Sequence, residues 1–133
     1  MGLWYSRPVL FVADIERAVR FYVDQLGFRE KWRFEQEVAQ VDRDECEIIV
    51  SAQRPAKIGK GMLFMELTAA DFAALPAMLA ANGVASTKGH WGYPVIIVAD
   101  PDGNELYFPD PTDPGPNPHS VVVGLNPCVL PAL

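Results

Sequence analysis

The order of the predicted secondary-structure elements constrains the fold most, because the same series occurs twice along the chain. In each half, one strand and one helix precede three further strands. The elements are expected at 8–12, 14–27, 30–34, 38–41 and 47–51 in the first half, and at 62–67, 71–82, 86–88, 93–99 and 105–108 in the second. The two halves share this order of elements, although their residues are not obviously similar.

Start and stop signals delimit the two helices. Asp14 is a good N-cap for the first helix, and Gly27 is a typical residue just after its end. Between them, apolar residues recur at helical spacing: Ile15, Ala18, Val19, Tyr22 and Leu26. Gly83 ends the second helix. We expect Pro76 in or near the first turn of that helix, because a proline farther inside would kink it.

Residues 100–108 predict a tight turn that leads into an alternating strand. Asp100 and Pro101 suit the early positions of a turn, and Gly103 supplies a positive φ at low cost. In the strand that follows, Glu105 and Tyr107 share one face, while Leu106 and Phe108 share the other.

Composition excludes several classes of protein. The 133 residues suit one domain, and a net charge of −6 argues against nucleic-acid binding, which requires a basic face. No apolar run approaches the ~20 residues of a membrane span. The spacing of Cys46 and Cys128 indicates neither a zinc site nor a disulfide framework, so we expect reduced thiols in a cytoplasmic protein.

The C-terminal segment differs from the rest of the chain. Seven prolines lie between Pro109 and Leu133, and only residues 121–123 could form a strand. We expect residues 110–133 to be a tail, either an extended arm or disordered, which leaves residues 1–109 as a single domain. The alternative is an arm that packs its Val and Leu side chains on a partner subunit.

Short motifs at both ends of the domain resemble one known superfamily. Residues 8–14 (PVLFVAD), 18–22 (AVRFY) and 26–28 (LGF) look like the opening of the vicinal oxygen chelate superfamily, and the turn at 100–104 (DPDGN) resembles its closing motif. This superfamily includes glyoxalase I, extradiol dioxygenases, fosfomycin-resistance enzymes and bleomycin-resistance proteins. The resemblance covers roughly residues 7 to 109.

The resemblance implies an α+β fold. Two βαβββ modules, at about 7–52 and 62–109 and joined by the linker 53–61, would form one curved mixed sheet with the helices outside. It also implies a homodimer with ligand sites in clefts shared between the subunits.

Within the superfamily, the chain is most similar to the bleomycin-resistance proteins. The similarity rests on residues 8–10, on Ala39 with residues 43–44 ahead of 51–52, and on residues 91–92 ahead of the final turn.

The resemblance also implies where metal-dependent members of the superfamily hold their cation. Carried over to this chain, the four ligand positions fall at Arg7, near Ile49, near Met62 and at Tyr107. Arginine has no acceptor atom, and isoleucine has no ligand atom. We therefore expect no metal and no other cofactor. The alternative is a displaced set of ligands using Glu66 and Glu105, which strand alternation places on the faces of Met62 and Tyr107.

The same alternation predicts the cleft. We expect its lining to be aromatic and apolar with a few charged groups: Arg7, Phe11, Trp32, Phe64, Glu66, Trp91, Glu105 and Tyr107. Two alternatives stay open. The aromatic residues of the strands could be core, and Arg7 could form an ion pair with Glu66 or Glu105. The two histidines, His90 and His119, are expected to be solvated.

Three functions are consistent with these features. The first is a metal-free protein that binds an aromatic or cationic small molecule in a cleft at a dimer interface, with no nucleic-acid or membrane partner. The second is a glyoxalase-like lyase or dioxygenase with the displaced ligands Glu66 and Glu105. The third is a structural role with a filled cleft.

Overall fold

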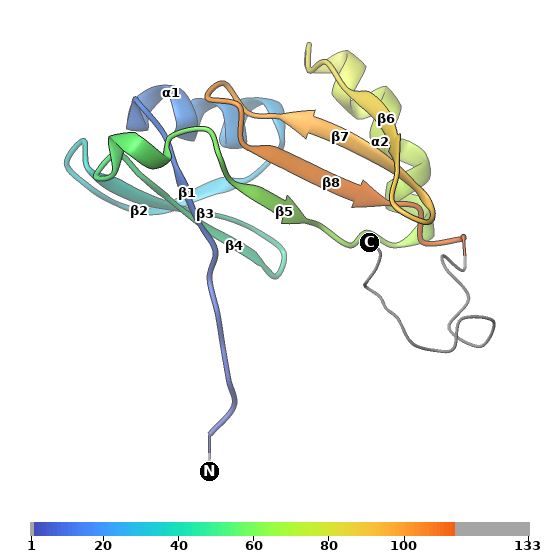
Figure 1. Cartoon of the computed structure of the whole chain (residues 1–133), viewed down its shortest axis with the longest axis horizontal. Coiled ribbons are helices and arrows are strands. Elements are labelled where there is room, and N and C mark those ends of the chain that lie inside the picture. Colours follow the sequence, from blue (N-terminus) through green and yellow to red (C-terminus); the bar gives the residue numbers. More distant parts are fainter. Residues whose placement is uncertain (1, 114–133) are drawn as a thin grey trace.

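A computed structural model describes residues 2–113, and its elements follow the predicted order (Figure 1). The first half contains β1 (Val9–Phe11), α1 (Ile15–Arg20), η1 (Phe21–Gln25), β2 (Arg29–Phe34), β3 (Val38–Arg43) and β4 (Cys46–Ser51). The short helix η2 (Pro55–Lys57) lies in the linker. The second half contains β5 (Met62–Phe64), α2 (Ala69–Ala81), β6 (Thr87–His90), β7 (Pro94–Ala99) and β8 (Glu105–Pro109).

The strands form two sheets with the same topology. Their orders are β1-β4-β3-β2 and β5-β8-β7-β6. In each sheet the first strand pairs in parallel with the last strand of its module, and the other neighbours are antiparallel. The predicted α+β fold of two βαβββ modules is confirmed. Hydrogen bonding divides the expected single curved sheet into two four-stranded halves.

The first helix begins and ends as its sequence indicates. The Asp14 carboxylate accepts a hydrogen bond from the Arg17 amide, and Gly27 has φ +78°. After Arg20 the helix widens into the π-helical turn η1. This turn lets the consecutive residues Phe21 and Tyr22 both lie buried, with their rings edge to face at 5.2 Å.

One hydrophobic core joins both modules on the helix side of the sheets. From the strands it takes Leu10, Ala39, Val41, Ile48, Val50, Ile96, Val98, Leu106 and Phe108. From the helices it takes Ile15, Ala18, Val19, Tyr22, Leu75 and Leu79. Since side chains alternate along a strand, the intervening residues point to the opposite side.

The turn at residues 100–104 ties the second module to the first. The Asp102 Oδ1 atom accepts bonds from the Ala13 amide (3.0 Å) and Arg17 Nη2 (2.8 Å), and the Tyr22 hydroxyl donates to Asp100 Oδ2 (3.1 Å). The fully buried Asn104 donates to the Phe11 carbonyl (3.1 Å). The turn therefore fixes one module against the other.

Two sequence expectations about elements are wrong. The second helix begins at Ala69 after its N-cap Thr68, so Pro76 lies inside the helix rather than in its first turn. Strand β5 ends at Phe64 instead of reaching residue 67, so strand alternation does not extend to Glu66. The proposed strand at residues 121–123 and His119 lie outside the described residues.

The N-terminal segment extends away from the body of the molecule, below the first sheet in Figure 1. Leu3 and Trp4 are fully exposed, the latter at 101%. Within residues 2–113, no helix is long and apolar enough to cross a bilayer.

Candidate ligand-binding face

The side of the two sheets that faces away from the core is called the open face here. Strand register defines it: Val9, Phe11, Trp32, Gln40 and Ile49 in the first module, and Met62, Phe64, Ile97, Glu105 and Tyr107 in the second. Several of its large apolar side chains are exposed, among them Val9, Trp32, Met62 and, beyond β6, Trp91. Exposed apolar surface of this extent is typical of an interaction site.

Three aromatic rings meet on the second module. Phe64 and Tyr107 are cross-strand partners, and their rings stack at 5.3 Å with an interplanar angle of 14°. Trp91, from the turn after β6, packs against both, at 5.1 Å from Phe64 and 5.9 Å from Tyr107. Trp91 remains 52% exposed, so one face of this aromatic cluster is open to solvent.

A carboxylate borders the aromatic cluster. The Tyr107 hydroxyl donates a hydrogen bond of 2.9 Å to Glu105 Oε1. Burial, the hydrogen bond and the charge of Glu105 together raise the pKa of the Tyr107 phenol above its ordinary value of 10.0. Near neutral pH the phenol thus stays protonated and acts as a donor, while Glu105 is exposed to solvent.

A hydrogen-bonded network occupies the first module. Its centre is Gln40, which is only 1% exposed although it lies on the open face. The Gln40 Oε1 atom accepts bonds from Arg7 Nη1 (2.6 Å) and Trp32 Nε1 (3.0 Å). The Gln40 Nε2 atom donates to Asp42 Oδ1 (2.9 Å) and Glu47 Oε1 (3.2 Å).

Arg7, Glu66 and Phe11 have separate surroundings. Arg7 bonds to the amide of Gln40, and among the described residues it forms no ion pair with Glu66 or Glu105, the alternative that the sequence left open. Glu66 follows the end of β5 and is exposed. Phe11 lies at the end of β1, where Lys57 Nζ stands 5.8 Å from its ring centroid.

The predicted site residues therefore form separate groups. Phe64, Trp91, Glu105 and Tyr107 are together in the second module, and Arg7 and Trp32 are together in the first. Sequence reasoning missed Gln40. Its only signal was a polar residue in the middle of an otherwise apolar strand pattern, between Ala39 and Val41.

Family and structure comparisons agree with this architecture. The model of the Glyoxalase/Bleomycin resistance protein/Dioxygenase superfamily matches residues 4–108. The chain belongs to this superfamily. No curated protein sequence is significantly similar to it.

Solved structures of the superfamily share the fold. The bleomycin-binding protein of Streptomyces verticillus, complexed with copper(II)-bleomycin, is 24% identical, with a TM-score of 0.67 over 82% of this chain and 97% of that one. TnmS3, an antibiotic-binding protein from Streptomyces sp. CB03234, is 24% identical, with a TM-score of 0.64 over 82% and 97%. Lactoylglutathione lyase from Agrobacterium tumefaciens is 15% identical, with a TM-score of 0.66 over 82% and 95%.

The residues at the four positions that the resemblance assigns to metal ligands do not fit a metal. Ile49 carries no donor atom, Met62 offers only a thioether, and the Arg7 guanidinium is a cation already bonded to Gln40. Tyr107 has a raised pKa, so its phenol keeps its proton and donates a hydrogen bond to Glu105. Among residues 2–113, no group of three or more His, Cys, Asp and Glu side chains is arranged to hold a metal ion.

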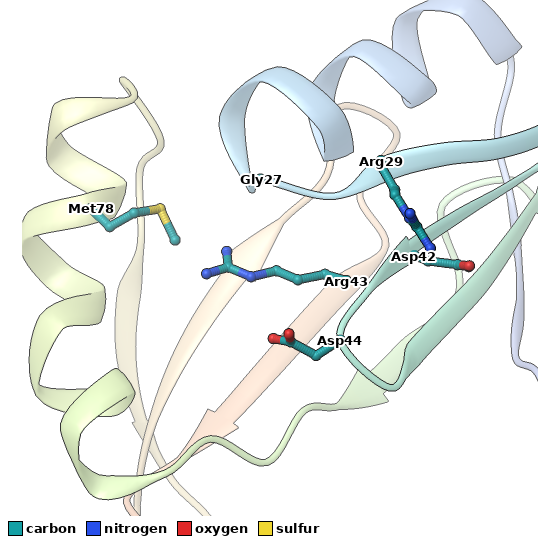
Figure 2. Close-up of a pocket in the computed structure, with 6 residues that line it drawn as sticks. All are labelled: Gly27, Arg29, Asp42, Arg43, Asp44 and Met78. Atoms are coloured by element: carbon teal, nitrogen blue, oxygen red, sulfur yellow. The ribbon is translucent and has the colours of Figure 1, made fainter.

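A depression of about 590 Å³ lies elsewhere, between the β3–β4 turn and α2 (Figure 2). Arg29, Asp42, Arg43, Asp44, Gly27 and Met78 line it. The Arg43 guanidinium extends into the depression and donates a hydrogen bond to the Leu26 carbonyl (2.6 Å). Of the two arginines that line the depression, Arg43 is therefore already bonded to the protein itself. No aromatic side chain lines this depression, which is open to solvent. We therefore regard the open face as the better candidate site.

Proposed function

We propose that this chain is a small-molecule-binding protein that sequesters an aromatic or cationic compound without a metal. The observation that carries the proposal is the aromatic cluster of Phe64, Trp91 and Tyr107, with Glu105 at its edge. Exposed ring faces stack on planar ligands, and a neighbouring carboxylate attracts a cation.

The alternative of catalysis has weaker support. A metal-dependent lyase or dioxygenase needs several N or O ligands directed at one point. Glu105 accepts a hydrogen bond from the Tyr107 hydroxyl. Glu66 lies two residues beyond the end of β5, so strand alternation does not direct its side chain to the open face. The donor chemistry thus favours binding over metal-assisted turnover.

The names of structural neighbours are consistent with a binding role. Two of them are described as a bleomycin-binding protein and an antibiotic-binding protein. At 24% identity their ligands cannot be transferred residue by residue, so bleomycin serves here as a first probe.

We propose that two copies of the chain share the site. The exposed apolar side chains of the open face, and the fully exposed Leu3 and Trp4, would be covered in such a dimer. We further propose that residues 1–109 form the binding domain and that residues 110–133 lie outside it.

Titration of tryptophan fluorescence with metal-free bleomycin, using protein treated with a chelator, tests the proposal. We expect saturable quenching in the micromolar range. The same preparation is analysed for metals before chelation. One tightly bound equivalent of Ni, Zn, Fe or Mn per protomer would contradict the metal-free proposal and support the alternative enzyme. Absence of quenching would exclude bleomycin as the ligand.

A further inference from the structure

The amide of Gln40 has a single orientation that satisfies its neighbours. Its oxygen accepts two hydrogen bonds, from Arg7 and Trp32, and its nitrogen donates two, to Asp42 and Glu47. This uses the full hydrogen-bonding capacity of a carboxamide. A flipped amide would set N–H against a guanidinium and an indole N–H, and oxygen against two carboxylates. The surroundings therefore fix the polarity of the group.

The two donors to Gln40 come from different parts of the first module. Arg7 precedes β1, and Trp32 lies in β2, directly across from Gln40 in the strand register. Both side chains are exposed, Trp32 at 38%, and both are long enough to adopt several rotamers in solvent. Their shared acceptor, one buried oxygen, holds the guanidinium beside the indole.

We propose that Gln40 is a positioning residue for ligand binding: it fixes the Arg7 guanidinium next to the Trp32 ring. The pair then accepts a planar aromatic group that carries a hydrogen-bond acceptor, such as a carbonyl or carboxylate. The ring lies on Trp32, and the acceptor takes one of the remaining Arg7 N–H groups. This inference rests on the proposed function, since it assumes that the open face binds a small molecule.

The positioning role is measurable without any ligand. In the 15N-labelled full chain, the indole N–H groups of Trp4, Trp32 and Trp91 give separate signals that Trp→Phe variants assign. Because Trp32 Nε1 donates to Gln40, its proton should exchange with solvent about fivefold more slowly in wild type than in Gln40→Met. In Gln40→Met this protection should be lost. An exchange rate for Trp32 that Gln40→Met leaves unchanged would overturn the proposal.

Two further variants separate positioning from general stability. Gln53→Met alters an exposed glutamine and should leave Trp32 protection intact. Gln40→Glu keeps an oxygen acceptor but adds a third carboxyl beside Asp42 and Glu47. Gln40→Glu should therefore destabilise the fold and still protect the Trp32 indole N–H from exchange. If Gln40 had only a structural role, stability and Trp32 protection would fall together. Loss of protection in Gln40→Glu, while its fold is retained, would contradict the proposal.

The binding arm uses bleomycin as the probe. Gln40→Met should raise the Kd about tenfold, because the Arg7 and Trp32 side chains are no longer held and must be ordered on binding. Gln40→Glu should restore part of the affinity. Equal affinity in Gln40→Met and wild type would overturn the positioning role. A protein that binds no bleomycin but protects Trp32 through Gln40 would support the positioning role and contradict only the proposed ligand.

Discussion

At the scale of single residues, Tyr107 shows how the second module departs from the sequence pattern of a metal site. The resemblance assigns Tyr107 to a ligand position of metal-dependent members, and in this chain its ring stacks on Phe64. Its proton is committed to Glu105. Tyr107 is thus part of an aromatic surface with a carboxylate at its edge.

The exposed ring of that surface gives a direct prediction. Trp91→Ala should weaken ligand binding by about 1–3 kcal/mol, as truncation of an aromatic anchor does. Because Trp91 is half exposed, the variant should lose little stability. Calorimetric titration measures the affinity, and Gln53→Ala, which alters an exposed side chain of the linker, is the control. Equal affinities of Trp91→Ala and wild type would place Trp91 outside the site.

Tyr22 predicts how stability depends on alkaline pH. Burial, followed by the charge and hydrogen bond of Asp100, raises the pKa of its phenol well above 10.0 in the folded protein. The contribution of Tyr22 is fully present below the unfolded-state pKa of about 10, and it is lost as pH rises through the higher folded-state value.

Denaturant unfolding as a function of pH checks this prediction. Wild-type stability should fall steeply above about pH 10. Tyr22→Phe should be less stable at neutral pH, because the Asp100 bond is lost, but should show a shallower alkaline decline. Parallel pH profiles for the two proteins would refute the assignment.

At the scale of elements, the turn at residues 100–104 connects distant parts of the chain. Asn104 donates to Phe11 and Asp100, and its Oδ1 accepts from the Gly61 amide at 2.8 Å. A side chain on Gly59 would collide with the Asp102 carbonyl, so the linker needs glycine where it passes the turn. The motif that marks the superfamily thus also holds the modules together.

Asn104→Ala should therefore destabilise the whole domain. We expect a loss of about 2–4 kcal/mol in the free energy of unfolding, because buried donors and acceptors in both modules lose their partners. Urea unfolding measures this loss. Gln53→Ala, on the surface, should change stability by less than about 0.5 kcal/mol. A loss for Asn104→Ala no larger than that of the control would show that the turn does not connect the modules energetically.

Most elements could be predicted from the sequence, and particular residues show why others could not. Apolar spacing and caps located the helical segment of α1 and η1 between Asp14 and Gly27, because these signals are local. Pro76 was placed wrongly because the second helix was expected to begin at residue 71, whereas α2 begins at Ala69 and holds this proline in its interior. Gln40 was missed because Arg7 is 33 residues away in sequence and Glu47 lies on the neighbouring strand, so the three side chains meet only after strand pairing.

At the scale of the whole molecule, the proposed self-association rests on an exposed apolar face and an extended N-terminal segment. We expect sedimentation of the full chain to give twice the monomer mass of 14.7 kDa. Dimerisation would remove the exposed apolar surface of Leu3 and Trp4 from water. The double variant Leu3→Ser, Trp4→Ser should therefore weaken the dimer. A wild-type protein that stays monomeric at high concentration would contradict the shared site.

A crystal structure of the purified protein, with anomalous data collected for transition metals, tests the central claim most directly. The account predicts two copies that share the open face, with an organic molecule or ordered solvent against Trp91 and Tyr107 and no anomalous peak at Glu105 or Glu66. A transition metal held by these carboxylates, or an open face closed by its own side chains, would contradict it.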